Sequence, residues 1–236
     1  MECEINLEGV SLDYPLYNQS NLELRKVITN FFNFNKKNSQ SDILTIRALK
    51  NINIKFNSGD RVALLGPNGS GKSTLLRVIG NIYKPTKGRI NVNRKPYSLL
   101  DLGMGIQGDA TGYENIYLMA YLRGMGKKEI DEKIKWIIEF SGLNEAISRE
   151  ARTYSSGMIV RLAVSIVLSN NPDIFLIDEF FSAGDKEFME KTTLRMKELI
   201  SKTGIFIIAT HDEGLANEMC NKRVFLNKGE IIKIET

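Results

Sequence analysis

Three short, continuous runs of apolar residues dominate the hydrophobic pattern of the chain. They cover residues 61–65, 174–177 and 205–209. Runs of this length without polar alternation are typical of strands that are buried on both faces, as in a parallel sheet. Segments with apolar residues at helical spacing separate the runs. This alternation of strands and helices predicts an α/β fold with a largely parallel sheet.

Alternating polar and apolar residues occur on both sides of this core. They predict half-buried strands over 4–10 and 49–56, and a closing hairpin of 224–226 and 231–234 around Asn227-Lys228-Gly229. The shorter elements that we expect are strands over 89–93 and 98–101, turns over 11–15, 57–60 and 84–88, and a loop over 103–112.

A helical pattern replaces the alternation between Tyr113 and about residue 170. Ile130, Ile134, Ile137 and Ile138 form a stripe along one helix face, and 157–168 is strongly apolar. We therefore expect a helical subdomain over about 103–170, inserted into the α/β core. A further helix is expected over 188–200.

The segment 17–42 differs from the rest in composition, because it is rich in asparagine and carries the cluster Phe31-Phe32-Asn33-Phe34. A partial apolar stripe predicts a short amphipathic helix with a flexible tail, inserted between two strands. Three interpretations remain open for its aromatic residues: local packing, contact with a partner, and contact with a membrane surface.

The composition indicates one globular domain over 1–236. Hydrophobic residues make up 42% of the chain, which is ordinary for a globular protein with a core. The net charge is only +4, and this favours a solvated surface of mixed charge over a nucleic-acid surface. Cys3 and Cys220 are far apart, as in proteins of reducing compartments. The N-terminus lacks the apolar region of a signal peptide, and no apolar run is long enough to span a bilayer. We expect a cytosolic protein, and any association with a membrane is expected to be peripheral.

A phosphate-binding loop follows the first apolar run. Its residues match the pattern G-x-x-x-x-G-K-[ST], and a strand precedes and a helix follows them, as this loop requires. The glycines let successive N–H groups point into one concavity, Lys72 adds a charge for the β- and γ-phosphates, and Ser73 offers a hydroxyl to Mg²⁺. The loop consists of Gly66, Pro67, Asn68, Gly69, Ser70, Gly71, Lys72, Ser73 and Thr74.

The other two apolar runs also end in polar residues. Asp178 and Glu179 follow one run, and His211, the only histidine, follows the other. Because ligands bind at the carboxyl ends of parallel strands, we expect these residues beside the phosphate loop. Asp178 is suited to hold Mg²⁺, Glu179 to accept a proton from an attacking water, and His211 to contact a γ-phosphate.

Two further features are weaker signals. Tyr14 lies just past the first predicted strand, where an aromatic ring could stack on a base, although a packed surface residue is the commoner case. Ser155 or Ser156 is a good N-cap for the apolar helix that begins near Gly157. Their exposed N–H groups and hydroxyls make a second phosphate site, which one nucleotide could share with the phosphate loop of another subunit, although the residues alone indicate no more than a capped helix.

Together these motifs resemble the ATP-binding cassette (ABC) ATPases over essentially the whole chain. The family's ordered set is the phosphate loop, a signature motif at Ser155-Ser156-Gly157, the Walker B strand 174–178 with Glu179, a D-loop at 182–185 that includes Asp185, and the switch residue His211. The resemblance implies a P-loop NTPase fold with a mixed, mainly parallel sheet, an antiparallel β subdomain and a helical subdomain.

Several variants resemble one group of this family, the ATPases that export O-antigen, capsule polysaccharide and teichoic acid. They are Tyr154-Ser155-Ser156-Gly157-Met158, Ser182-Ala183-Gly184-Asp185, Thr111-Gly112-Tyr113-Glu114-Asn115 and the long insert after Tyr14. The resemblance implies a subunit that hydrolyses ATP with Mg²⁺ at the cytoplasmic face of the inner membrane and powers export of a lipid-linked polysaccharide. No C-terminal carbohydrate-binding domain is expected.

The resemblance also implies a composite site. Two copies pair head to tail, each ATP lies between one phosphate loop and the partner's signature motif, and Tyr14 stacks on adenine. Closure of the dimer acts on membrane permease subunits through the loop 101–107. The family's Q-loop glutamine, a ligand of Mg²⁺ or water, is matched by Asp101 or Gln107, of which Gln107 is favoured, and Tyr17 is an alternative to Tyr14.

Other classes fit less well. A GTPase needs an N-K-x-D motif, and the Asn-Lys pairs here lack its aspartate. The ABC proteins of DNA repair carry a long coiled coil and those of translation carry two cassettes, so no nucleic-acid partner is expected. An ABC ATPase for another lipid, a drug or a lipoprotein remains as the alternative, because only the motif variants argue against it.

Overall fold

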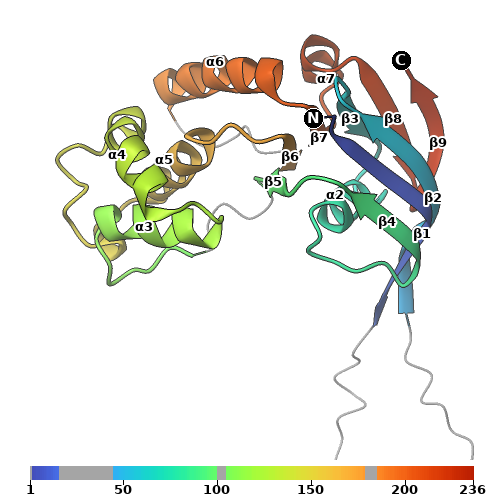
Figure 1. Cartoon of the computed structure of the whole chain (residues 1–236), viewed down its shortest axis with the longest axis horizontal. Coiled ribbons are helices and arrows are strands. Elements are labelled where there is room, and N and C mark those ends of the chain that lie inside the picture. The colour runs from blue at the N-terminus through green and yellow to red at the C-terminus, as the bar shows by residue number, and fades with distance from the viewer. Residues whose placement is uncertain (1, 16–44, 100–104, 179–184) are drawn as a thin grey trace, which may run out of the picture.

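A six-stranded sheet forms the centre of the computed structural model, which describes residues 2–15, 45–99, 105–178 and 185–236 (Figure 1). The first five strands in the sheet order are parallel, and the last one runs antiparallel to its neighbour. In spatial order the strands are β5 (Pro96–Ser98), β6 (Ile174–Asp178), β7 (Ile205–Ala209), β3 (Arg61–Leu65), β8 (Lys222–Asn227) and β9 (Glu230–Glu235).

The three continuous apolar runs are β3, β6 and β7, and they are direct neighbours in this sheet. Successive side chains of a strand point to opposite faces, so a continuous run must be covered on both. One face packs against α2 (Lys72–Ile79) and the second sheet, and the other packs against α5 (Ser156–Leu168), α6 (Lys186–Lys202) and α7 (Glu213–Met219). The prediction of a largely parallel α/β core is confirmed.

The second sheet is antiparallel, with β1 (Glu4–Pro15) between β2 (Thr45–Asn57) and β4 (Lys87–Val92). The predicted turn over 11–15 is wrong, because β1 continues to Pro15. Its last residues pair with β2, from Leu12 opposite Leu49 to Pro15 opposite Thr45. Irregular pairing after Leu7 shifts the side-chain alternation, which hides the continuation in the sequence.

A group of helices lies to one side of both sheets (Figure 1). It contains α3 (Gly112–Leu122), α4 (Lys127–Ser141), the 3₁₀ turn η2 (Ala151–Thr153) and α5. Thr111 and Glu114 form a capping box that fixes the start of α3. The helices share an apolar core of their own, built around Ile116, Ile130 and Ile137. This group lies within the range predicted to be helical.

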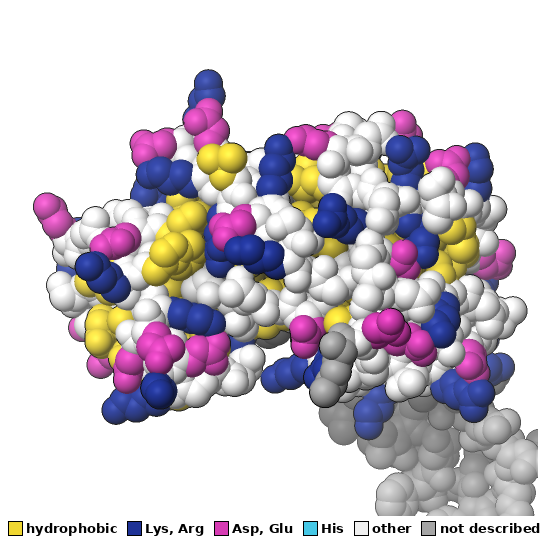
Figure 2. Space-filling model, turned by 45° about the horizontal axis from the view of Figure 1, so that its top comes forward, with side chains coloured by type: hydrophobic (Ala, Val, Ile, Leu, Met, Phe, Trp, Pro, Cys, Tyr) yellow, Lys and Arg dark blue, Asp and Glu magenta, His cyan; other side chains and the backbone are white. Residues whose placement is uncertain are grey.

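Smaller differences from the predictions concern short elements. The strand expected over 98–101 is β5, which lies earlier, and β4 begins inside the predicted turn over 84–88. Helix α7 was not predicted, since its seven residues give too short a pattern. The inserted segment 17–42 lies outside the described residues. Figure 2 shows acidic and basic side chains interspersed on one face, with small separate apolar patches.

Candidate functional site

The phosphate loop lies between β3 and α2 and depends on glycine geometry. Gly66, Gly69 and Gly71 have φ angles of 147°, 77° and 106°, which other residues rarely adopt. Helix α2 begins directly after Gly71, and no side chain caps its N-terminus. The N–H groups of its first turn are therefore available to an anion, on the positive end of the helix dipole.

Lys72 is the buried cation of this loop, with only 7% of its surface exposed. Its ammonium group donates hydrogen bonds to the carbonyl oxygens of Gly66 at 2.7 Å and Pro67 at 3.3 Å. The Ser70 hydroxyl is also buried and has no hydrogen-bond partner among the described residues. The loop thus holds a positive charge against its own backbone, where it can meet phosphate oxygens.

A cavity of about 590 Å³ opens from this loop, which is a size typical of small-molecule sites. Tyr14 from β1 lines the same cavity and packs edge-on against Tyr83, with the ring centroids 5.6 Å apart. The Tyr14 hydroxyl donates to the Thr74 hydroxyl at 3.4 Å. The cavity is lined by Tyr14, Ile46, Arg47, Ala48, Lys50, Asn68, Gly69, Ser70, Gly71, Lys72, Ser73, Thr74 and Lys228.

The structure therefore places Tyr14 and the phosphate loop on one cavity, although β1 and α2 are far apart in sequence. Tyr17 lies outside the described residues. A tyrosine ring and an anion-binding loop on one cavity are the groups that suit the base and the phosphates of a nucleotide.

The β8–β9 hairpin supports the phosphate loop from outside. The Gly229 N–H donates to the Ser70 carbonyl at 2.9 Å, and the Lys50 N–H donates to the Gly229 carbonyl at 2.8 Å. A Cβ atom on Gly66 would lie 2.2 Å from the Leu226 carbonyl oxygen. The loop has no room to move toward the hairpin.

We predict that Gly66→Ala lowers the free energy of unfolding by about 3 kcal/mol, because it adds a backbone clash to an unfavourable φ angle. Urea denaturation measures this change. Gly59→Ala is the matched control, since Gly59 has φ 93° but no atom within 4 Å of an added Cβ. Equal losses in the two variants would show that the contact with Leu226 is unimportant.

The carboxyl ends of β6, β7 and β3 form one edge beside this loop. Asp178 pairs with Ala209, which pairs in turn with Leu64. The residues after β7 thus lie next to β3, which enters the phosphate loop, and the half-buried Asp178 lies one strand further along the same edge. Glu179 follows Asp178 directly in the sequence and lies outside the described residues.

His211 is exposed and follows β7 after one buried residue, Thr210. The Thr210 N–H donates to the Leu64 carbonyl at 3.1 Å, which ties this turn to β3. Asp212 caps α7 by accepting from the Leu215 N–H, and its own N–H donates to the Thr210 hydroxyl at 3.0 Å. These contacts fix the backbone on both sides of His211.

The predicted metal ligands fit Mg²⁺ in their chemistry. Ser73 offers a hydroxyl on the cavity, and Asp178 offers a carboxylate at the end of β6, which β7 separates from β3. Mg²⁺ is commonly held by one or two such oxygen ligands together with substrate phosphates and water. Among the described residues, no group of three or more acidic, histidine or cysteine side chains is placed to hold a metal ion.

The signature residues lie on a different part of the molecule. Ser155 caps α5 by accepting from the Met158 N–H at 3.2 Å, and Ser156 is exposed. Helix α5 belongs to the helical group, whereas α2 lies against the sheets (Figure 1). None of the signature residues lines the phosphate-loop cavity. The chain therefore does not bring the predicted signature residues to its own phosphate loop.

Asp185 is the N-cap of α6 and accepts from the Phe188 N–H at 2.9 Å. That hydrogen bond and, less strongly, the guanidinium of Arg161 hold the pKa of Asp185 below its usual range. Arg161 on α5 lies 3.3 Å from the Asp185 carboxylate. The end of the D-loop is thereby joined to the helix that begins with the signature residues.

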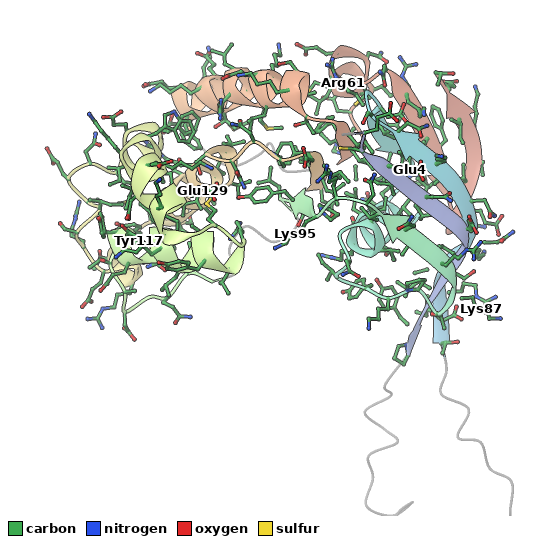
Figure 3. The ribbon with its side chains drawn as sticks, viewed as in Figure 1. Glu4, Arg61, Lys87, Lys95, Tyr117 and Glu129 are labelled. Carbon is green, nitrogen blue, oxygen red and sulfur yellow. The ribbon has the colours of Figure 1, made fainter. Side chains whose placement is uncertain are left out.

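Gln107 is not brought to the phosphate loop. It lines a separate open cavity of about 630 Å³ on the helical group, together with Tyr113, Tyr117 and Tyr121. Figure 3 shows Tyr117 on the helical group, away from the sheets. The rival residue Asp101 lies outside the described residues.

Asn115 is a structural residue of this region whose role the sequence did not reveal. Its side chain is fully buried. It accepts from the Gln107 N–H at 2.8 Å and donates to the carbonyl oxygens of Gln107, Ala110 and Thr111. A polar residue among apolar ones at the start of a helix was its only sequence signal.

Comparisons with known proteins agree with this site. The sequence model of the ABC transporter family matches residues 49–182. The O-antigen export system ATP-binding protein RfbE of Yersinia enterocolitica is 38% identical over 95% of this chain and 94% of its own length. The teichoic acids export ATP-binding protein TagH of Listeria monocytogenes is 31% identical over 99% of this chain and 67% of its own.

Solved structures show the same fold. A dimeric post-hydrolysis state of an ATP-binding cassette with ADP and Pi superposes with a TM-score of 0.72 at 23% identity, covering 98% of both chains. No helix in the described ranges has the length and apolar character needed to cross a bilayer.

Proposed function

Because the chain belongs to the ABC transporter family of ATP-binding proteins, we propose that it hydrolyses ATP to power export of a lipid-linked polysaccharide across the cytoplasmic membrane. The observation that carries the ATPase assignment is the cavity that joins the phosphate loop to Tyr14. The polysaccharide assignment rests on relatives from O-antigen and teichoic acid export systems, which align over nearly the whole chain.

The P-loop backbone and Lys72 hold the β- and γ-phosphates of ATP, and the Tyr14 ring stacks on adenine. Ser73 and Asp178 hold Mg²⁺, which neutralises charge on the phosphates. Glu179 accepts a proton from the attacking water, and His211 contacts the γ-phosphate. Gln107 is the weakest of the proposed metal ligands, because it lines the tyrosine cavity of the helical group instead.

The active unit is a head-to-tail pair of this chain. Each ATP lies between one chain's phosphate loop and the other chain's Ser155, Ser156 and Gly157, with Asp185 at the end of the D-loop nearby. The position of α5 supports this arrangement. Its first residues do not line the phosphate-loop cavity of the same chain, so their N–H groups can contact a nucleotide only if a second chain supplies it. The pair is peripheral, on the cytoplasmic face, and acts on integral permease subunits.

Deleting the gene from its source organism tests the substrate assignment. We expect loss of a surface polysaccharide, restored by the wild-type chain and not by Glu179→Gln. Unchanged surface polysaccharide, together with ATP hydrolysis by the purified chain, would contradict the polysaccharide and favour another lipid, a drug or a lipoprotein as cargo.

A further inference from the structure

Lys228 is an unusual residue at the tip of the β8–β9 hairpin. Its φ angle is 47°, in the left-handed region. The other non-glycine residues of the described chain with positive φ, Asn51 and Asn81, are asparagines, which tolerate this conformation well. With Gly229 at φ 82°, Lys228 occupies the turn position at which asparagine, aspartate or glycine is favoured. A lysine here is unfavourable for the turn, and such residues are concentrated at functional sites.

The turn brings Lys228 to the phosphate-loop cavity. Two backbone hydrogen bonds of Gly229, to Ser70 and Lys50, fix the hairpin tip against the loop. Gly229 has no space for a side chain, because a Cβ atom would lie 2.6 Å from the Ala48 carbonyl oxygen. Lys228 therefore lines the cavity next to a glycine that is fixed to Ser70 of the phosphate loop.

The charges of the lining distinguish Lys228 from its neighbours. Arg47 is bound by Asp13 at 2.7 Å, Lys50 lies 3.4 Å from Glu230, and Lys72 donates to the loop carbonyls. Lys228 is exposed and makes no ion pair or side-chain hydrogen bond with the other residues that the structure describes. Among the residues that the structure describes, no carboxylate lines this cavity. The site therefore offers one uncommitted ammonium group to an anionic ligand.

We propose that Lys228 binds the phosphate chain of the nucleotide from the outer side of the phosphate loop, as a second cation that adds to Lys72. The inference rests on the proposed function, because it takes the nucleotide as the ligand of this cavity. It assigns a binding role to the C-terminal hairpin, which lies outside the motifs found in the sequence.

The Lys228→Asn variant distinguishes a role of Lys228 in ligand binding from a role in stability. A binding role predicts weaker nucleotide binding without a loss of stability, whereas a structural role predicts a lower melting temperature. Asparagine suits the turn, so the melting temperature should stay the same or rise. The Kd for ATP and for ADP should increase about fivefold at low salt, as expected for loss of one exposed charge contact. The difference should shrink at 1 M salt, where the charge is screened.

Lys233→Asn is the control, since Lys233 lies on the same hairpin, pairs with Glu235 and does not line the cavity. Lys228→Arg should keep most of the affinity. An unchanged Kd for ATP in Lys228→Asn, or an equal loss for adenosine, would overturn the phosphate contact. A wild-type chain that bound no ATP would instead contradict the proposed function.

Discussion

The Glu179→Gln variant is expected to bind ATP with wild-type affinity and to hydrolyse it about 10²- to 10⁴-fold more slowly. A general base contributes a factor of this order, and glutamine cannot accept the proton. Binding should persist because the phosphates are held by other groups, namely the P-loop backbone and Lys72, whose ammonium group lies 2.7 Å from the Gly66 carbonyl oxygen. Phosphate release and equilibrium binding of a fluorescent ATP analogue measure the two quantities.

Glu187→Gln provides the control for this prediction. Glu187 lies nearby in the sequence, on the first turn of α6, and its carboxylate pairs with Lys191 at 2.6 Å. This variant should turn over ATP at the wild-type rate. Normal turnover in Glu179→Gln would remove the base assignment.

The Ser156→Arg variant should bind ATP normally but hydrolyse it about 10²-fold more slowly. A loss of this size is typical of removing a group that stabilises the charge developing in the transition state. Ser156 does not line the phosphate-loop cavity of its own chain, so binding there should not change. A bulky arginine at the exposed start of α5 should instead prevent this surface from closing on the partner's nucleotide. Steady-state hydrolysis and nucleotide binding on the same preparation test both statements.

Ser201→Arg serves as the comparison, because Ser201 is an exposed serine at the far end of α6. It should leave hydrolysis unchanged. A Ser156→Arg chain with the wild-type rate would exclude a shared site between two chains.

The core of the fold could be predicted from the sequence because burial on both faces produces a distinct pattern. The continuous runs at β3, β6 and β7 have this property, and their shared sheet edge collects the phosphate loop, Asp178 and the turn before His211. The family model and the solved structures confirm the fold class.

The sequence was least informative where contacts with segments remote in the chain determine the structure. The end of β1 looked like a turn because Tyr14 and Pro15 follow an irregularity in the pairing, and only the facing strand β2 holds them extended. The contact between the β8–β9 hairpin and Ser70 joins residues that are remote in sequence, so no local pattern reports it. The position of Gln107 also depends on such a contact, because its N–H donates to the buried Asn115 side chain.

Other parts of the site cannot be read from one chain. The start of α5 does not line the phosphate-loop cavity, and in the proposed function their relation depends on a second copy. Sequence spacing located both sets of groups but not the geometry between them.

The central claim, a pair of chains closed around ATP, is tested most directly by the solution mass of the Glu179→Gln variant with and without ATP. Light scattering after size-exclusion chromatography gives this mass. The account predicts a monomer without nucleotide and a dimer with ATP, because slow hydrolysis preserves the closed state. A variant that binds ATP tightly but stays monomeric would contradict the shared site.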